Sequence, residues 1–311
     1  MIRAFLVTLY SVFLLAACGG GSSSAPPASP PPPPVGGTGL VITTANAKPA
    51  ARVAYGSTMQ SMDTGGLVGD SGIAGSSSGG FQKPGVQGAS PGRLARIFEK
   101  IPLGPDTYDC GVSGTQTISG NLASLFTLTV GDQINVEAAD CDDGLGEVIN
   151  GRMEMTVATF SGDLVLGLYL LEMSVLLVDF EVVTATDTVL SNGDSLVSID
   201  TTGTPMIGMS ISGNSMTSVV NGNAETMSNF STTQSVDTSV MPEPYTLSSM
   251  GTIDSAALNG AISYTTPVTF QGAGADYPFA GELLITGADG GTIRLIALDA
   301  TNVRIETDTN G

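Results

Sequence analysis

The chain has 311 residues, a formal net charge of −19, and neither histidine nor tryptophan. Without histidine, mechanisms that need an imidazole base or an imidazole metal ligand are excluded. The acidity argues against nucleic acid as a partner, because phosphates attract Lys and Arg. Hydrophobic residues make up 41% of the chain, which is enough for a core, so the chain is not disordered throughout.

The first eighteen residues have the pattern of a secretory signal. Arg3 gives a positive start, and residues 4–17 form an apolar run that is too short to cross a bilayer, which needs about 20 residues. The run ends in Leu15-Ala16-Ala17-Cys18, which resembles the lipobox of bacterial lipoproteins. That resemblance implies removal of residues 1–17 and acylation of Cys18, palmitate included. The alternative is an ordinary signal with a stray cysteine.

Residues 18–40 read as a lipidated cysteine followed by a Gly/Ser/Pro tether. Five consecutive prolines, residues 30–34, favour extended polyproline II, which suits a spacer above a bilayer. Two or more acyl chains would give stable anchoring. Residue 19 is Gly rather than Asp, which in Gram-negative lipoproteins implies sorting to the outer membrane. The resemblance leaves the periplasmic face and the cell surface as alternatives.

Residues 41–104 are expected to be a low-complexity region with one or two short helices. The alanine-rich residues 41–62 suit a helix despite Pro49, and residues 63–92, rich in Gly, Ser and Pro, suggest a disordered or surface-laid loop. Residues 93–101 place four apolar side chains on one helical face, and we expect this helix to dock on the main domain.

Residues 105–311 have the pattern of an antiparallel β domain. Val, Ile, Thr, Leu and Ser dominate, and period-2 alternation in residues 133–137, 178–182 and 302–306 predicts strands with one buried face. Asn-Gly and Asp-Gly pairs accept the backbone angles of tight hairpin turns. We therefore predict a mainly β fold, either an antiparallel β-sandwich or a barrel-like meander of hairpins. The pairs begin at Asn150, Asn192, Asn221, Asn259, Asp143 and Asp289.

Two segments of this domain stand out. Residues 164–178 are strongly apolar but too short for a membrane helix, so we expect a strand buried on both faces or two strands joined near residues 171–174.

Residues 277–299 resemble a segment near the C-terminus of uncharacterised bacterial cell-envelope lipoproteins. Their pattern is that of a hairpin with an Asp-Gly turn. Arg294 and Arg304 are each expected to offset an acid on a neighbouring strand.

If Cys18 is acylated, Cys110 and Cys141 form the only possible pair. Outside the cytoplasm this favours a disulfide. Closing a loop of 30 intervening residues would stabilise the fold by roughly 3–4 kcal/mol. A metal pair is the alternative, but it lacks further ligands of the usual kind. No Cys-x-x-Cys motif indicates redox catalysis.

No catalytic motif and no cofactor site is predicted. A serine nucleophile needs a base, and the chain has no histidine anywhere and no lysine after Lys100. The densest acidic cluster, Asp140, Asp142 and Asp143, is a weak calcium candidate because calcium prefers oxygen ligands. A solvated, turn-forming acidic loop is the favoured interpretation of that cluster.

These patterns together predict a lipid-anchored cell-envelope protein with a binding or structural role, and not an enzyme. Its expected partner is the lipid bilayer, reached through the N-terminal acyl chains, and an envelope protein or a glycan is a further candidate. Two alternatives stay open. One is a carboxylate-based, glycosidase-like hydrolase, since paired acids about 5–10 Å apart can cleave glycosidic bonds. The other is a calcium-dependent adhesion module.

Overall fold

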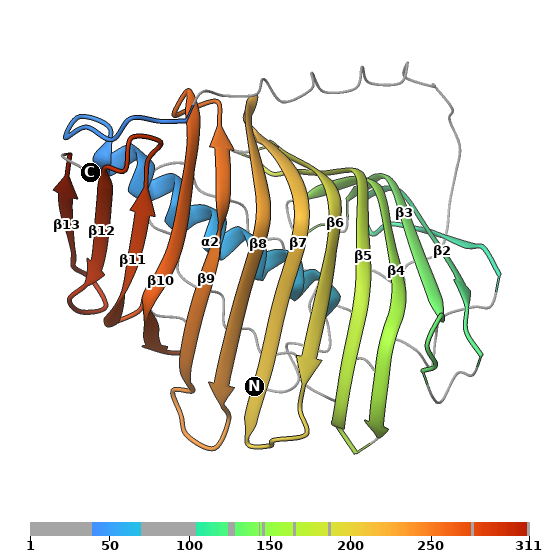
Figure 1. The fold of residues 1–311 in the computed structure, drawn as a ribbon. Coiled ribbons are helices and arrows are strands. Elements are labelled where there is room, and N and C mark those ends of the chain that lie inside the picture. The colour runs from blue at the N-terminus through green and yellow to red at the C-terminus, as the bar shows by residue number, and fades with distance from the viewer. Residues whose placement is uncertain are drawn as a thin grey trace.

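A computed structural model describes residues 39–69, 104–123, 128–142, 144, 147–163, 166–185, 188–274 and 277–309, with side chains for all but residues 59–69. These residues form one helix and a single antiparallel sheet in which thirteen strands follow one another in chain order (Figure 1). The elements are α2 (Ala47–Gly69), β1 (Asp106–Asp109), β2 (Ser113–Asn121), β3 (Gln133–Asp142), β4 (Val148–Asp163), β5 (Leu168–Val183), β6 (Thr188–Asp200), β7 (Met206–Val220), β8 (Asn223–Asp237), β9 (Pro244–Ser255), β10 (Gly260–Ala273), β11 (Ala280–Thr286), β12 (Thr292–Ala297) and β13 (Val303–Asp308).

The predicted mainly β, antiparallel meander of hairpins is confirmed. Each strand pairs with its neighbours in sequence, so every connection is a hairpin and no strand crosses over another. The strands make one sheet rather than two facing sheets, and β1 and β13 stand at its two ends without closing it. The helix α2 lies across one face of this sheet (Figure 1).

The N-terminal turn of α2 explains why the helix begins where it does. The backbone N–H of Thr43 donates to Asn46 Oδ1 at 2.8 Å, and the N–H of Asn46 donates back to Thr43 Oγ1 at 3.3 Å. Pro49 falls in the first turn, where its missing N–H has no helical partner to lose. The helix then continues to Gly69, so the loop expected from residue 63 is wrong for residues 63–69. Residues 70–103, with the predicted helix at 93–101, lie outside the described residues.

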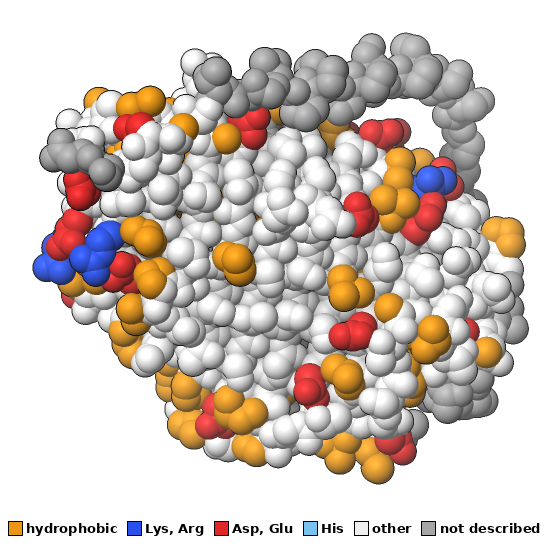
Figure 2. Space-filling model, viewed as in Figure 1, with side chains coloured by type: hydrophobic (Ala, Val, Ile, Leu, Met, Phe, Trp, Pro, Cys, Tyr) orange, Lys and Arg blue, Asp and Glu red, His pale blue; other side chains and the backbone are white. Residues whose placement is uncertain are grey.

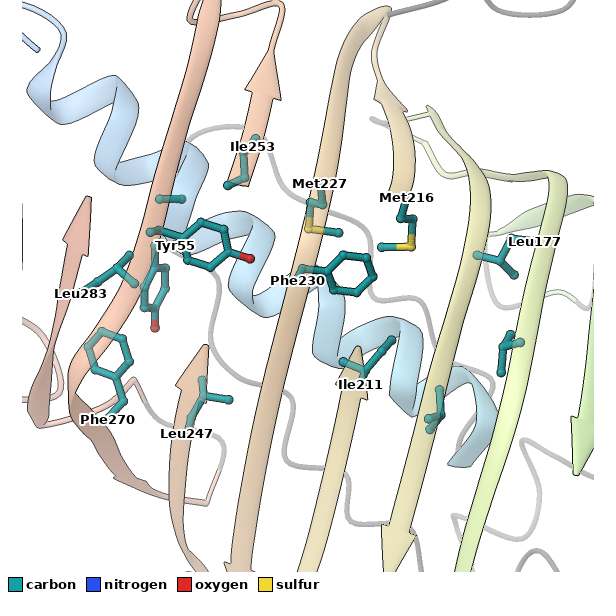
Figure 3. Packing of buried hydrophobic residues seen from close by; sticks show 14 of the residues in the cluster. Tyr55, Leu177, Ile211, Met216, Met227, Phe230, Leu247, Ile253, Phe270 and Leu283 are labelled. Atoms are coloured by element: carbon teal, nitrogen blue, oxygen red, sulfur yellow. The ribbon is translucent and has the colours of Figure 1, made fainter. Parts of the chain in front are cut away.

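Small side chains let α2 sit close to the sheet. Ala50, Ala51, Ala54 and Thr58 are fully buried and recur at helical spacing, which gives the helix a narrow face toward the strands. The helix contacts β7, β8, β9, β11, β12 and β13. Between helix and sheet lies one continuous hydrophobic core, part of which is drawn in Figure 3. Its most deeply buried large side chains include Tyr169, Tyr245, Phe230, Phe270, Ile211 and Leu247.

Residues 168–178 of the apolar segment all lie in the single strand β5, so both expectations for the segment are wrong. From Leu168 to Leu177, buried side chains alternate with accessible ones. Leu171, Met173 and Val175 point into the core, whereas Leu168 and Leu176 lie on the other face and are 43% and 36% exposed. The segment looks uniformly apolar because leucines also occupy the outward positions of a half-buried strand.

Two of the predicted Asn-Gly turns are not turns. Asn221-Gly222 joins β7 to β8 and Asn259-Gly260 lies at the β9–β10 turn, as predicted. Asn150-Gly151 and Asn192-Gly193 instead lie inside β4 and β6, beside shifts in strand register that mark β-bulges. A positive φ angle is compatible with a β-bulge as well as with a tight turn, and the sequence alone does not distinguish the two.

The C-terminal hairpin matches the prediction in most respects. The Asp289-Gly290 turn joins β11 to β12, and Arg294 on β12 contacts Glu282 on β11 at 2.7 Å and Glu306 on β13 at 3.2 Å. Arg304 contacts Glu306 on its own strand, not on a neighbouring one. The predicted buried face of residues 302–306 is only partly present: Ile305 packs against the core, whereas Val303 is 41% exposed.

Candidate functional site

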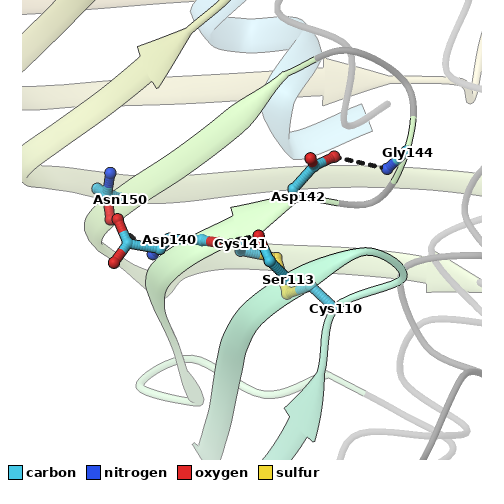
Figure 4. The surroundings of a disulfide bond; sticks show 7 residues. All are labelled: Cys110, Ser113, Asp140, Cys141, Asp142, Gly144 and Asn150. Atoms are coloured by element: carbon cyan, nitrogen blue, oxygen red, sulfur yellow. Dashed lines mark hydrogen bonds between the residues drawn. A yellow bond between two sulfur atoms is a disulfide. The ribbon is translucent and has the colours of Figure 1, made fainter. Parts of the chain in front are cut away.

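The predicted disulfide is present. Cys110 follows β1 directly and Cys141 lies in β3, and their sulfurs are bonded with Cα atoms 5.4 Å apart (Figure 4). The bond ties the turn between β1 and β2 to the third strand. It therefore fastens the first edge of the sheet, where β1 pairs on one side only. Both cysteines are buried and pack with Ala138.

The acidic residues around Cys141 do not converge. Asp140 and Asp142 point away from each other in Figure 4. The backbone N–H of Asp140 donates to Asn150 Oδ1 at 2.7 Å, and the Asp142 carboxylate accepts the N–H of Gly144 at 2.8 Å. Asp143 lies outside the described residues. In the part of the chain that the structure describes, no three His, Cys, Asp or Glu side chains gather as metal ligands.

The proposed lipidation residue, Cys18, also lies outside the described residues. The described chain starts at Gly39, where Leu40 is held by two backbone hydrogen bonds. Its N–H donates to the carbonyl of Ala261 at 2.8 Å, and its carbonyl accepts the N–H of Ala288 at 2.9 Å. The segment thus enters the fold at the β11–β12 turn. Within the described residues, no helix has the length and apolarity that a membrane crossing requires.

A pocket of about 150 Å³ lies at the opposite end of strands β11 and β12 from this entry segment. It is enclosed by side chains from α2 and β10, by the segment before β11, and by the end of β12 with the turn that follows. We call it the aromatic pocket. Its lining residues are Tyr55, Phe270, Tyr277, Pro278, Leu295, Ala297, Asp299, Ala300, Thr301, Asn302 and Val303.

The floor of the aromatic pocket is apolar and buried. The rings of Tyr55 and Phe270 meet edge to face, with centroids 5.9 Å apart and planes at 89°. Both side chains are buried, as are Leu295 and Ala297. Burial raises the pKa of the Tyr55 hydroxyl, and the nearby hydroxyls of Tyr245 and Tyr277 raise it further, so the Tyr55 phenol stays neutral at physiological pH.

The rim of the pocket carries one negative charge. The Asp299 carboxylate accepts hydrogen bonds from the side chain of Asn302 and from the hydroxyl and N–H of Thr301. These hydrogen bonds lower the pKa of Asp299 to about 2, with the Asn302 side chain as the largest cause. The carboxylate is therefore ionised throughout the physiological range. None of the described residues that line the pocket is Lys or Arg, so the electrostatic field in the pocket favours neutral or cationic groups.

Sequence reasoning did not find this pocket. Its residues come from segments more than 200 positions apart. The sequence pattern of each segment, taken alone, predicts only a core strand, a helix or a turn. Asp299 and Asn302 carry a local signal, because Asp and Asn close turns through their side chains, but that signal predicts a turn and not a cavity beside it.

Comparisons with known proteins give no further constraint. No protein-family model matches the chain, and neither the search of curated proteins nor the search of solved structures finds a match.

Proposed function

We propose that this chain is a lipid-anchored cell-envelope protein that binds a small ligand in the aromatic pocket. The observation that carries the proposal is the pocket itself: an apolar, aromatic floor under a rim with one ionised carboxylate. Binding sites for small molecules are characteristically concave and apolar with a few fixed polar groups. A single carboxylate at the rim supports binding better than a hydrolysis that needs two carboxylates.

The volume and charge of the pocket define the ligand class. An apolar cavity of 150 Å³ has room for a group about the size of one benzene ring. Asp299 and the rings of Tyr55 and Tyr277 favour a neutral or cationic molecule, since aromatic faces attract cations by about 0.5–2 kcal/mol. A carboxylate on the ligand would meet Asp299 and be repelled. The proposed ligand is therefore a ring-sized apolar group that is uncharged or carries an amine.

Three ligands of one shape test the proposal. Benzylamine, benzyl alcohol and benzoate carry the same ring with a positive, neutral and negative substituent. We expect the first two to raise the melting temperature of the full chain and to change its tyrosine fluorescence, which Tyr55 and Tyr277 would report without interference from tryptophan. Benzoate should have a smaller effect. Equal effects of all three, or none from any, would contradict the proposal.

A variant that fills the pocket provides the control. Ala300→Trp places a large ring at the rim, where Ala300 is only partly buried, and should remove the response to benzylamine. Ala256→Trp changes an exposed residue in the β9–β10 turn, outside the pocket, and should retain it. Loss of the response in both variants would point to a general effect of the added ring.

The anchor is tested separately. Labelling cells with a radioactive fatty acid should mark the chain, and Cys18→Ser should remove the label and release the protein from the membrane fraction. Because Leu40 enters the fold at the β11–β12 turn, the described chain begins at the end of β11 and β12 that lies away from the pocket. A fatty-acid label that persists in Cys18→Ser would overturn the anchor.

A further inference from the structure

We propose that the outer face of the sheet, opposite α2, binds a neutral polysaccharide chain centred on a hollow over β5–β8. The hollow has a volume of about 370 Å³, within the range of small-molecule sites. It is separate from the aromatic pocket and shares no residue with it. Its lining residues are Ser174, Asp194, Ser195, Leu196, Ser212, Gly213, Asn214, Asn229 and Phe230.

The strand register places the central side chains of the hollow together. Ser174 on β5 pairs with Leu196 on β6, which pairs with Ser212 on β7. Residues directly opposite on neighbouring strands point to the same face. Ser174 and Leu196 lie between buried neighbours and Ser212 follows the buried Ile211, so their side chains point outward. Leu196 is 39% exposed. The hollow thus has hydroxyls on both sides of one apolar contact.

The polar groups of the hollow are available to a ligand. Among the described residues, the side chains of Ser174, Asp194, Ser212, Asn214 and Asn229 make no hydrogen bond to another protein group. Serine hydroxyls and asparagine amides both donate and accept hydrogen bonds, which matches the hydroxyls of a sugar. Leu196 would contact the C–H face of a sugar ring. This combination of short polar groups and one apolar side chain suits a polyhydroxyl ligand.

The surroundings favour a chain over a single sugar. Rows of hydroxyls run from the hollow across the neighbouring strands, and one row follows the register Ser198, Ser210, Thr233 and Ser248 from β6 to β9. The hydroxyls of Thr233 and Ser248 lie 2.7 Å apart. In Figure 2 this face is mostly white, the colour of the backbone and of side chains that are neither hydrophobic nor charged, with scattered acids and with basic groups only toward its margins. An extended ligand would find the same chemistry along the face.

The charge of the face selects against acidic polymers. Among the described residues that line the hollow, Asp194 is the only ionisable one, and none is Lys or Arg. The whole chain carries a net charge of −19. A phosphate- or uronate-bearing polymer would therefore be repelled, while a neutral one would not.

Affinity electrophoresis of the full chain tests this inference. Native gels would contain dextran, mannan or a β-glucan as neutral probes, or alginate as an acidic probe, in a detergent without a sugar headgroup. We expect at least one neutral polysaccharide to retard the chain and alginate to have no effect. Removing three polar groups of the hollow in Ser174→Ala/Ser212→Ala/Asn214→Ala should weaken that binding at least tenfold. Retardation by none of the neutral probes would overturn the inference.

Two control variants test whether the polysaccharide binds at the hollow. Thr246→Ala removes an exposed hydroxyl on β9, on the same face but outside the hollow, and should leave binding within twofold of the parent chain. Ala300→Trp fills the aromatic pocket and should not affect it either, which separates this inference from the proposed function. If Thr246→Ala weakens binding as much as the triple variant, the hollow is not the site. If calcium alone raises the melting temperature and Asp194→Asn abolishes that rise, the hollow is a cation site and the inference fails.

Discussion

Asn192 on β6 accepts a hydrogen bond from the backbone N–H of Asp179 on β5, at 2.7 Å. Asp179 has a φ of 47°, and Gly193, next to Asn192, has a φ of 140°. The asparagine side chain thus takes the place of a ladder carbonyl where the extra residue of the bulge interrupts pairing. Since bulges increase the local twist and bend of a strand, this contact helps to curve the sheet on which α2 lies.

The same arrangement occurs two strands earlier. Asn150 on β4 accepts the N–H of Asp140 on β3 at 2.7 Å, and Asp140 has a φ of 49°. Gly151, the next residue, has a φ of 93° and lies against the carbonyl of Asp179. The two bulges are therefore adjacent, and Asp179 takes part in both.

Replacing Gly151 tests how tightly this line of bulges is packed. In Gly151→Ala the new Cβ would meet the carbonyl oxygen of Asp179 at 2.0 Å, in a backbone conformation that L-residues seldom adopt. Because neither the strand nor its neighbour can move alone, we expect a loss of about 3 kcal/mol in the free energy of unfolding, measured with urea. Gly222→Ala is the matched control. Gly222 has a φ of 83° but no atom near its Cβ position, so the loss should be about 1 kcal/mol. Equal losses would show that the contact with Asp179 does not matter.

Glu225 should make stability fall as the pH rises. It lies on β8 and accepts a hydrogen bond from Ser255 at 3.2 Å. Burial raises the pKa of Glu225 above 4.5, although the hydroxyls of Ser255 and Ser57 lower it in part. The folded state therefore holds this proton more tightly than the unfolded state. The stabilisation is complete below the unfolded pKa and is lost as the pH rises through the folded pKa.

Glu225→Gln should accordingly be more stable than the parent chain at neutral pH, because the amide carries no charge to bury. The difference in urea midpoint should shrink as the pH falls through the folded pKa of Glu225 and should be gone below the unfolded pKa of about 4.5. A variant that is less stable than the parent at pH 7 would contradict the expected burial of the charge.

Glu282 should have the opposite pH dependence. Hydrogen bonds from Arg294 lower the pKa of Glu282 below 4.5, against a smaller opposing effect of burial. The stabilisation is therefore present above the unfolded pKa and lost as the pH falls through the folded pKa. Glu282→Gln should be less stable than the parent at neutral pH, and the two urea midpoints should converge in acid. Arg304→Gln, which affects an exposed contact with Glu306, should change little at either pH.

Removing the disulfide should loosen one edge of the sheet first. We expect Cys110→Ser/Cys141→Ser to lose about 3–4 kcal/mol, because a loop closed by residues 31 positions apart is freed in the unfolded chain. Hydrogen exchange should accelerate in β1–β3 more than in β8–β12, where α2 covers the sheet. Uniform acceleration across the sheet would contradict a local role for the bond.

Local patterns in the chain predict part of this architecture. Turn residues such as Asn221-Gly222 and period-2 alternation predict an antiparallel meander, and the cysteine count predicts the bond between Cys110 and Cys141. The turn and strand predictions succeed because they depend on residues close in sequence. The disulfide prediction succeeds because, once Cys18 is set aside, only two cysteines remain to pair. Leu15–Cys18, which predict the anchor, lie outside the described residues and stay a prediction.

Three features of this protein depend on the tertiary structure and not on local sequence pattern: the choice between turn and bulge, the face of a strand that is buried, and the surfaces that can bind a ligand. Whether an Asn-Gly pair is a turn or a bulge depends on the strand opposite, as Asp179 shows at Asn192. Whether Leu176 faces the core depends on which side of the sheet α2 covers. The aromatic pocket and the outer hollow exist only because distant segments meet: Tyr55 reaches Phe270 across 215 positions, and Ser174 comes beside Leu196 and Ser212 through strand register. The sequence by itself determined that the chain forms antiparallel strands joined in hairpins, since backbone preference is local. The surfaces that can bind a ligand follow from packing between distant segments, which only the tertiary structure decides.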